Sequence, residues 1–225
     1  MSETKGKPSS VRFSNTDWFH PGIPVVIGGA GGIGSWLTFF LARQECKIYL
    51  HDFDEVDETN LGGQLYGDNY IGLRKTAAMS DIAEHFCGNT EVNDMGKFTE
   101  DSFASPIMFS SFDNMDARKL MFKKWKEQPD RELFIDGRML CESGMIFTVR
   151  PGDEERYEKE LFDDGDVEDQ DCSMKATSHC GAFIASSMVS IFNNYITNVK
   201  RKTYFREVPF KVDFGMDLLM YDVTL

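Results

Sequence analysis

The chain has 225 residues, of which 41% are hydrophobic and 27% charged, as expected for a globular protein with a sizeable core. Its formal net charge of −13 argues against a nucleic-acid partner, because duplex binders need a basic surface to neutralise phosphates. The apolar runs are too short to span a membrane, and the polar N-terminus lacks the apolar core of a secretory signal.

The cysteine content indicates the cellular compartment. There are five cysteines, an odd number, and no Cys-x-x-Cys pair. This pattern argues against a disulfide framework and against a four-cysteine zinc site. The cysteines therefore predict a cytoplasmic protein that needs no zinc. The short apolar runs predict that it has no contact with membranes.

The N-terminal residues are polar and are interrupted by Pro8, Pro21 and Gly22, which predicts a mobile arm over residues 1–22. We predict a single domain over residues 23–225. In its first part, the sequence patterns of strands and helices alternate. We predict strands over residues 23–27, 46–50, 92–96, 107–109 and 133–135, and helices that begin near residues 33, 75 and 113. The helix over residues 75–86 should bury Ala78, Ile82 and Phe86.

The pattern changes after residue 137. A strand over residues 145–149 follows so closely that we expect antiparallel pairing, and an acidic crossover loop follows at about 151–175. A long helix over residues 176–197 and two strands near 210–214 and 218–223 end the chain. The prediction is a Rossmann-like α/β fold with helices on both faces of a mixed sheet, whose N-terminal strands are parallel and C-terminal strands antiparallel. Its ligand should bind at the carboxyl ends of the parallel strands.

A glycine-rich segment follows the first predicted strand and opens the first helix of this domain. Gly29, Gly31 and Gly34 allow the backbone to turn sharply and approach a phosphate, which the free N–H groups of a helix N-terminus attract. Asp52 ends the next strand, where a carboxylate accepts bonds from ribose hydroxyls. Together these residues predict a nucleotide site and leave NAD, FAD and ATP open.

Four further residues bear on which nucleotide binds. Asn60 and Gln64 lie in the loop after Asp52, and Asp113 ends the fourth predicted strand. Lys75 begins a helix, where a cation is unfavourable because it opposes the helix macrodipole, and a nearby polyphosphate would remove this penalty. Removal of the Lys75 side chain should therefore leave the ligand-free protein equally or slightly more stable. The simpler interpretations are a surface lysine at position 75 and a helix N-cap at Asp113. Beside a triphosphate, Asp113 would instead bind Mg²⁺.

The order and spacing of these residues resemble the ThiF/MoeB/HesA adenylyltransferases, which share their fold with ubiquitin-activating enzymes. The matching segments are Gly29-x-Gly31-x-x-Gly34, Asp52-Phe53-Asp54, Asn60-Leu61-x-x-Gln64, Lys75 and Phe112-Asp113-Asn114. The resemblance implies that ATP binds at the glycines, Asp52, Asp54, Asn60, Gln64 and Lys75, and that Asp113 binds Mg²⁺. It also implies that the C-terminal carboxylate of a ubiquitin-like protein, sulfur-carrier protein or peptide attacks the α-phosphorus, which yields an acyl-adenylate and pyrophosphate.

The sequence departs from the family pattern at Gly63, where the family usually has an arginine before the glutamine. Arg74 and Arg138 are the candidates to replace it. Family members are usually homodimers in which an N-terminal arginine reaches the partner's ATP, and Arg12 is the counterpart here. The resemblance also makes Cys172, in the crossover segment, a possible thioester acceptor, whereas Cys180 is expected to be a buried structural thiol.

The acidic segment has eleven acids and two bases between Asp153 and Asp171. It is either a solvated loop or a contact for a basic tail of the partner protein.

Two other functions remain as alternatives to adenylyl transfer. A NAD-dependent oxidoreductase would use the glycines and Asp52 but not Asn60, Lys75 and Asp113 together. A non-catalytic nucleotide-binding or interaction module of the same fold is favoured by Gly63.

Overall fold

The computed structural model describes residues 8–163, 177–201 and 205–225. The strands are β1 (Pro24–Gly28), β2 (Lys47–His51), β3 (Val92–Asp94), β4 (Ile107–Ser110), β5 (Leu133–Leu140), β6 (Ser143–Val149), β7 (Lys211–Gly215) and β8 (Met220–Thr224). The helices are α1 (Pro8–Phe13), α2 (Gly34–Arg43), α3 (Lys75–Cys87), α4 (Met115–Lys126), α5 (Glu154–Glu158) and α6 (Ser178–Lys200), with 3-10 turns at Glu58–Asn60 and Asp68–Tyr70.

The described strands form one eight-stranded sheet in the order β3-β2-β1-β4-β5-β6-β7-β8. Strands β1 to β5 pair in parallel, whereas β5, β6, β7 and β8 pair antiparallel in sequence. The predicted fold class is thus confirmed. Because the chain runs outward from β1 to β3 and returns to β4 on the other side of β1, the order reverses between β1 and β4. Open α/β sheets bind ligands at such a reversal.

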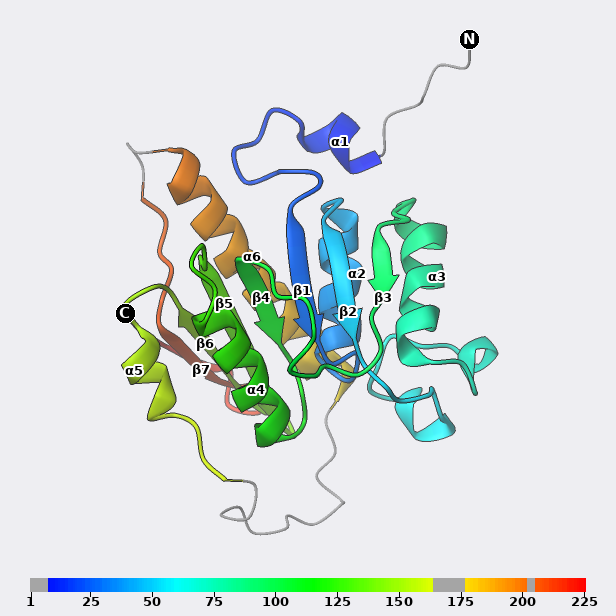
Figure 1. Cartoon of the computed structure of the whole chain (residues 1–225). Coiled ribbons are helices and arrows are strands. Elements are labelled where there is room, and N and C mark those ends of the chain that lie inside the picture. The colour runs from blue at the N-terminus through cyan, green and yellow to red at the C-terminus, as the bar shows by residue number, and fades with distance from the viewer. Residues whose placement is uncertain (1–7, 164–176, 202–204) are drawn as a thin grey trace.

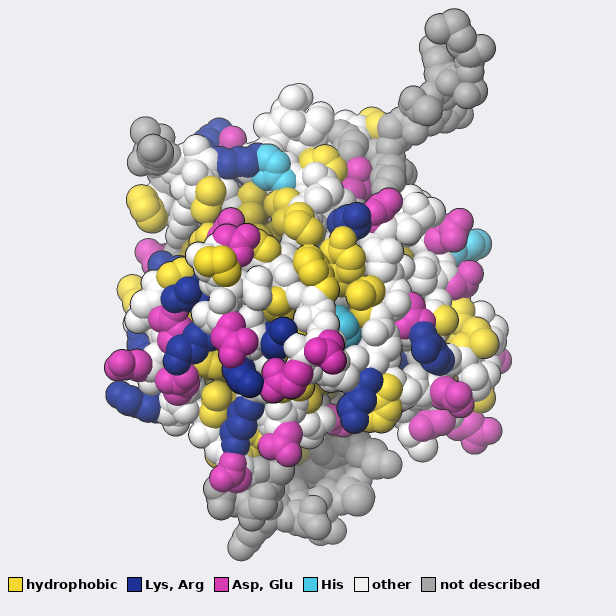
Figure 2. Space-filling view, viewed as in Figure 1, with side chains coloured by type: hydrophobic (Ala, Val, Ile, Leu, Met, Phe, Trp, Pro, Cys, Tyr) yellow, Lys and Arg dark blue, Asp and Glu magenta, His cyan; other side chains and the backbone are white. Residues whose placement is uncertain are grey.

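Helices cover both faces of the sheet (Figure 1), and each face has its own apolar core. Helices α2, α3 and α6 pack on one face through residues such as Leu37, Met79 and Phe192. Helix α4 packs on the other, where Trp125 and the α5 residue Tyr157 are fully buried. In the view of Figure 2, acidic and basic side chains alternate over α4 and α5, which are joined by ion pairs such as Lys126–Glu158.

The prediction that Phe86 is buried is wrong, since its side chain is 60% exposed. Helix α3 continues to Cys87, and the inward positions of its last turns go to Ala83 and Cys87, which lie four residues apart. The ring of Phe86 is therefore turned toward α2, where it meets the edge of Phe39 at 6.5 Å between centroids.

The residues that precede β1 are more closely attached to the domain than a mobile arm would be. Residues 8–13 form α1, Phe19 is buried, and Asp17 forms an ion pair of 2.5 Å with Arg201 at the end of α6. The rings of Phe13, Trp18 and Phe19 contact one another. At least this part of the predicted arm therefore has defined contacts.

Candidate active site

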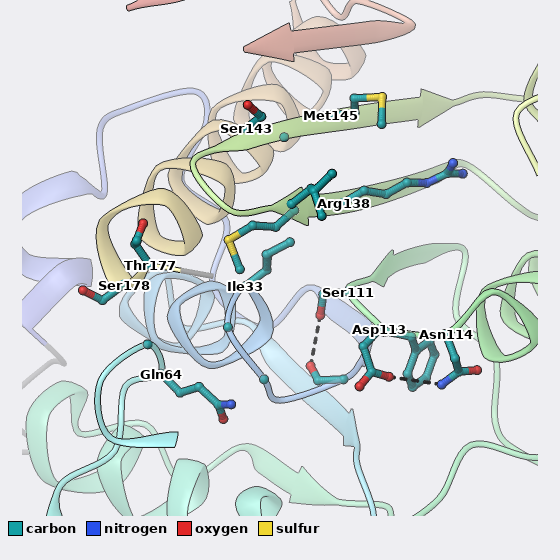
Figure 3. Close-up of a pocket in the computed structure, with 18 of the residues that line it drawn as sticks. Ile33, Gln64, Ser111, Asp113, Asn114, Arg138, Ser143, Met145, Thr177 and Ser178 are labelled. Carbon is teal, nitrogen blue, oxygen red and sulfur yellow. Dashed lines mark hydrogen bonds between the residues drawn. The ribbon is translucent and has the colours of Figure 1, made fainter. Parts of the chain in front are cut away.

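A pocket of about 1530 Å³ opens at the carboxyl ends of β1, β2 and β4 and continues along β5, β6 and β7. Its lining includes most of the residues that the sequence predicted for the site, whereas Gly34, Arg12 and Cys172 are not among the described lining residues. The predicted residues in the lining are Gly29, Gly31, Asp52, Asp54, Asn60, Gln64, Lys75 and Asp113. Figure 3 shows Ser111, Asp113 and Asn114 on one side of the pocket and Gln64 on another.

The glycine-rich segment is folded tightly between β1 and α2. Gly29 has a φ of +88°, and a Cβ there would lie 2.7 Å from the Ser111 carbonyl oxygen. A Cβ at Gly34 would lie 1.9 Å from the Gly29 carbonyl oxygen, so both positions require glycine. At Gly31, by contrast, no heavy atom lies within 4 Å of the position of a Cβ. The backbone at Gly31 therefore borders open space in the pocket, as a phosphate-binding loop does.

Asp52 connects this segment to the end of β2. One carboxylate oxygen accepts the Ala30 N–H at 2.7 Å, and the other accepts the Asp54 N–H at 2.8 Å. Burial raises the pKa of Asp52, and the two N–H bonds partly offset that rise. Each oxygen keeps a free lone pair, so Asp52 can both fix the glycine segment and accept a bond from a ligand hydroxyl.

Lys75 is buried, which the sequence did not indicate. Its side chain is 8% exposed, and its ammonium donates to Asp54 at 2.8 Å. The pairing with Asp54 compensates for the position of the cation at the N-terminus of α3. The ion pair borders the pocket, so Lys75 and Asp54 are placed together at the edge of the same site.

Asn60 and Gln64 project from the loop after β2. The Asn60 side-chain oxygen accepts the Asp57 N–H at 3.1 Å and closes a capping box, so the amide group is already partly engaged. The Gln64 side-chain oxygen is buried and has no hydrogen-bond partner among the described residues. A buried oxygen without a partner is costly, and a ligand in the pocket would remove that cost.

Asp113 is exposed at the end of β4 and is not the cap of the following helix. Asn114 caps α4, because its side-chain oxygen accepts the Ala117 N–H at 2.9 Å. The contact of Asp113 is with the Asn114 side-chain amide at 3.2 Å. Its carboxylate is thus available to the pocket.

The donor set suits Mg²⁺ delivered with a nucleotide. Among the described residues, no three His, Cys, Asp or Glu side chains gather as a protein-only metal site. Mg²⁺ is commonly held by one or two carboxylates together with substrate phosphates and water. The exposed carboxylate of Asp113, in the same pocket as the glycine-rich segment, fits that requirement.

The sequence analysis named Arg138 but missed the buried ionic cluster to which it belongs, whose two arginines, Arg118 and Arg138, line the pocket. Asp136 is fully buried and accepts bonds from Arg118, from Arg138 at 2.7 Å and from the Tyr157 hydroxyl at 2.9 Å. Arg118 also donates to the carbonyls of Phe112 and Gly137. A signal was present, since Arg118 lies on the apolar face of α4 at helical spacing from Met115, Met121 and Phe122.

Other predicted residues lie elsewhere. Arg12, in α1, is exposed and absent from the pocket lining. Cys172 and residues 164–171 of the acidic segment lie outside the described residues. Cys180 is fully buried, and burial raises the pKa of its thiol to about 11, as expected for a structural thiol.

Several acids in the described part of the acidic segment have basic partners. Glu154 pairs with Arg131 and Asp163 with Lys119. Glu158 pairs with Lys126. These acids are thus partly neutralised within the chain.

Together, the open glycine segment, the carboxylate of Asp52 and the ammonium of Lys75 can bind a phosphorylated nucleoside. Asp113 adds a carboxylate that can hold a metal ion beside its phosphates. Among the described lining residues there is no cysteine, so the pocket offers charge and positioning rather than a thiol nucleophile.

Solved structures with the same fold agree with this architecture. E. coli MccB with ATP aligns with a TM-score of 0.65 at 15% identity, over 90% of this chain and 63% of that chain. E. coli MccB with succinimide aligns with a TM-score of 0.65 at 14% sequence identity, over 90% of this chain and 63% of that chain. PaaA aligns with a TM-score of 0.64 at 18% sequence identity, over 89% of this chain and 63% of that chain. The chain therefore spans about 63% of the length of these proteins.

The sequence itself identifies the family. No curated protein matches the chain. No helix among the described residues is both long enough and apolar enough to cross a membrane. The model of the ThiF family matches residues 23–214, which include strands β1 to β6 and all of β7 except its last residue. The chain belongs to the ThiF family.

Proposed function

We propose that this protein is an ATP-dependent adenylyltransferase that activates the C-terminal carboxylate of a peptide or a small ubiquitin-like or sulfur-carrier protein. The observation that carries the proposal is the meeting of the open backbone at Gly31, the buried Lys75 and the exposed Asp113 in one pocket. The ATP and the MccA peptide in structures of MccB, a protein of the same fold, support it.

Each residue then has a role in positioning or charge neutralisation. Asp52 accepts a ribose hydroxyl, the glycine segment and Lys75 hold the phosphates, and Asn60 and Gln64 border the same region. Asp113 would hold Mg²⁺, which supplies neutralisation of phosphate charge. The substrate carboxylate attacks the α-phosphorus, the bond to the β-phosphate oxygen breaks, and pyrophosphate leaves.

We further propose a cytoplasmic homodimer in which Arg12 of one subunit approaches the ATP of the other. The exposure of Arg12 and its distance in the fold from its own pocket are compatible with such an arrangement. We also propose a thioester on Cys172, which lies outside the described residues, and a contact between the acidic segment and a basic tail of the substrate.

Calorimetric titration with ATP·Mg²⁺ and with NAD tests the choice of nucleotide. We expect binding of ATP and not of NAD, because Lys75 and Asp113 have no task in binding a dinucleotide. The non-catalytic alternative is favoured by Gly63 and predicts ATP binding without turnover. Tighter binding of NAD than of ATP would reject the proposed activity.

Two glycine substitutions should separate folding from phosphate binding. In Gly34→Ala the new methyl collides with the Gly29 carbonyl, and we expect a loss of roughly 1–3 kcal/mol in the free energy of unfolding. In Gly31→Ala the methyl enters open space, so the ligand-free protein should stay as stable while ATP affinity falls. Urea denaturation and calorimetry measure the two effects. Equal behaviour of both variants would contradict the assignment of the space above Gly31 to phosphate.

Lys75→Ala should weaken ATP binding and also destabilise the ligand-free protein. The sequence predicted no loss of stability, but the structure shows a buried side chain paired with Asp54. Loss of its buried methylenes should reduce the free energy of unfolding by roughly 1–3 kcal/mol. Loss of a charged hydrogen bond should weaken ATP binding by roughly 1.5–3 kcal/mol. Lys123→Ala, at an exposed position on α4, is the control, and unchanged ATP affinity in Lys75→Ala would reject the phosphate role.

A further inference from the structure

The pocket is short of positive charge for a polyphosphate. Among the described residues that line it, the cations are Lys75, Arg118 and Arg138, whereas six aspartates border it. Those aspartates are Asp52, Asp54, Asp113, Asp213, Asp217 and Asp222. Lys75 shares its charge with Asp54, and position 63 has glycine. A triphosphate in this pocket therefore needs a further cation besides Mg²⁺ and Lys75.

Arg118 is fully engaged by protein groups. One terminal nitrogen donates to Asp136 and to the Gly137 carbonyl, and the other donates to the Phe112 carbonyl. Its side chain is 8% exposed. Arg118 thus connects α4 to the strand ends and has little capacity left for a ligand.

Arg138 has unused capacity. Its Nε donates to Asp136 at 2.7 Å and its Nη1 to the Glu160 carbonyl at 2.9 Å, whereas the buried Nη2 has no partner among the described residues. Two guanidinium groups share the single carboxylate of Asp136, so this buried cluster carries an excess positive charge. An uncompensated buried charge with an unpaired N–H₂ group is costly unless an anion lies beside it.

Aromatic rings surround the Arg138 guanidinium, and one of them borders the pocket. The guanidinium lies 4.4 Å from the ring centroid of Phe147, which is buried, and 5.9 Å from that of Phe162. Phe162 is 40% exposed and lines the pocket. Arg138 itself also lines the pocket (Figure 3), so an anion there can approach the guanidinium beside this exposed ring.

Arg74, the other candidate from the sequence, does not meet these conditions. Its guanidinium pairs with Asp94 at the end of β3, its side chain is half exposed, and it is absent from the pocket lining. It is the N-cap residue of α3 and stands next to Lys75 in the chain. Arg74 is therefore a suitable control residue.

We propose that Arg138 binds the phosphates of the nucleotide and supplies the guanidinium that the chain lacks at position 63. This inference rests on the proposed function, because it takes ATP to be the nucleotide. The phosphate oxygens accept the N–H groups of Nη2, while the bonds to Asp136 and Glu160 hold the guanidinium in place. The guanidinium group that contacts the phosphates thus comes from β5 instead of from the loop after β2.

Calorimetric titrations of Arg138→Met, Arg138→Lys and Arg74→Met with ATP, pyrophosphate and adenosine test this assignment. In Arg138→Met we expect the dissociation constants of ATP and pyrophosphate to rise about tenfold or more, as for loss of a charged hydrogen bond. The adenosine constant should not change, because adenosine has no phosphate. Arg138→Lys should recover part of the affinity, and Arg74→Met should bind all three ligands as the wild-type protein does.

The outcomes separate this inference from the function on which it rests. If Arg138→Met binds ATP as tightly as the wild type, or loses ATP and adenosine affinity equally, Arg138 is only structural and the inference fails. ATP binding by the wild type with the expected losses, but without adenylyl transfer, would uphold the inference and reject the proposed function. A wild-type protein that binds no ATP would reject both.

Discussion

Asp113→Asn should abolish ATP–pyrophosphate exchange while the protein remains folded. The carboxylate of Asp113 is exposed to the pocket that the glycine-rich segment also lines, and asparagine removes the charge that Mg²⁺ requires while keeping the size of the side chain. We expect a loss of at least about 100-fold in the exchange rate, the scale on which removal of one electrostatic group slows an enzyme. Labelled pyrophosphate incorporated into ATP measures the effect.

The structure makes this substitution cleaner than the sequence suggested. Because Asn114 and not Asp113 caps α4, the change leaves the cap intact, and the melting temperature should stay that of the wild type. Asp116→Asn, on the exposed first turn of α4, is the matched control and should retain full exchange. If Asp113→Asn retained the wild-type exchange rate, the proposed role of Asp113 in binding Mg²⁺ would be wrong.

The largest loss of stability is expected for Asp136→Asn. Asp136 is fully buried and is the carboxylate that Arg118 and Arg138 share, so its neutralisation leaves two buried guanidinium groups without their counter-charge. Breaking a buried ion pair from one side typically reduces the free energy of unfolding by about 3–5 kcal/mol. Urea denaturation followed by circular dichroism measures this difference.

Asp163→Asn provides the contrast. Asp163 is exposed and pairs with Lys119 on the surface of α4, where solvent weakens the attraction, so its substitution should leave the denaturation midpoint unchanged. If Asp136→Asn were as stable as Asp163→Asn, the cluster of Arg118, Asp136 and Arg138 would not hold α4, β5 and α5 together.

The parallel half of the sheet was predictable because its strands are short, β-branched and separated by turn residues. In β1, Val25 and Ile27 are buried on one face of the sheet and Val26 on the other, which gives a continuous apolar run instead of alternation. The length of β5 was not predictable. Beyond Ile135 the apolar run is interrupted by Asp136, Gly137 and Arg138, and β5 remains a strand to Leu140 because it pairs with β6. Tertiary pairing thus overrides local preference there.

The site was predictable to the extent that its residues follow strand ends. Asp52 and Asp113 lie where parallel strands end at one edge of the sheet, so the topology alone brings them to the same pocket. The burial of Lys75 and its pairing with Asp54 depend on the path of the intervening loop, for which local sequence carries no signal. The same holds for Asp136, whose partners come from α4, β5 and α5.

The most direct test of the central claim is pyrophosphate exchange by the wild-type protein with a pool of peptides that end in a free carboxylate. The same pool with C-terminal amides is the control, since an amide cannot attack the α-phosphorus as a carboxylate does. Adenylyl transfer predicts Mg²⁺-dependent incorporation of label into ATP with the free peptides and none with the amides. Tight ATP binding without exchange, with peptides and with carrier proteins that end in a free carboxylate, would show instead that the pocket binds a nucleotide without activating a carboxylate.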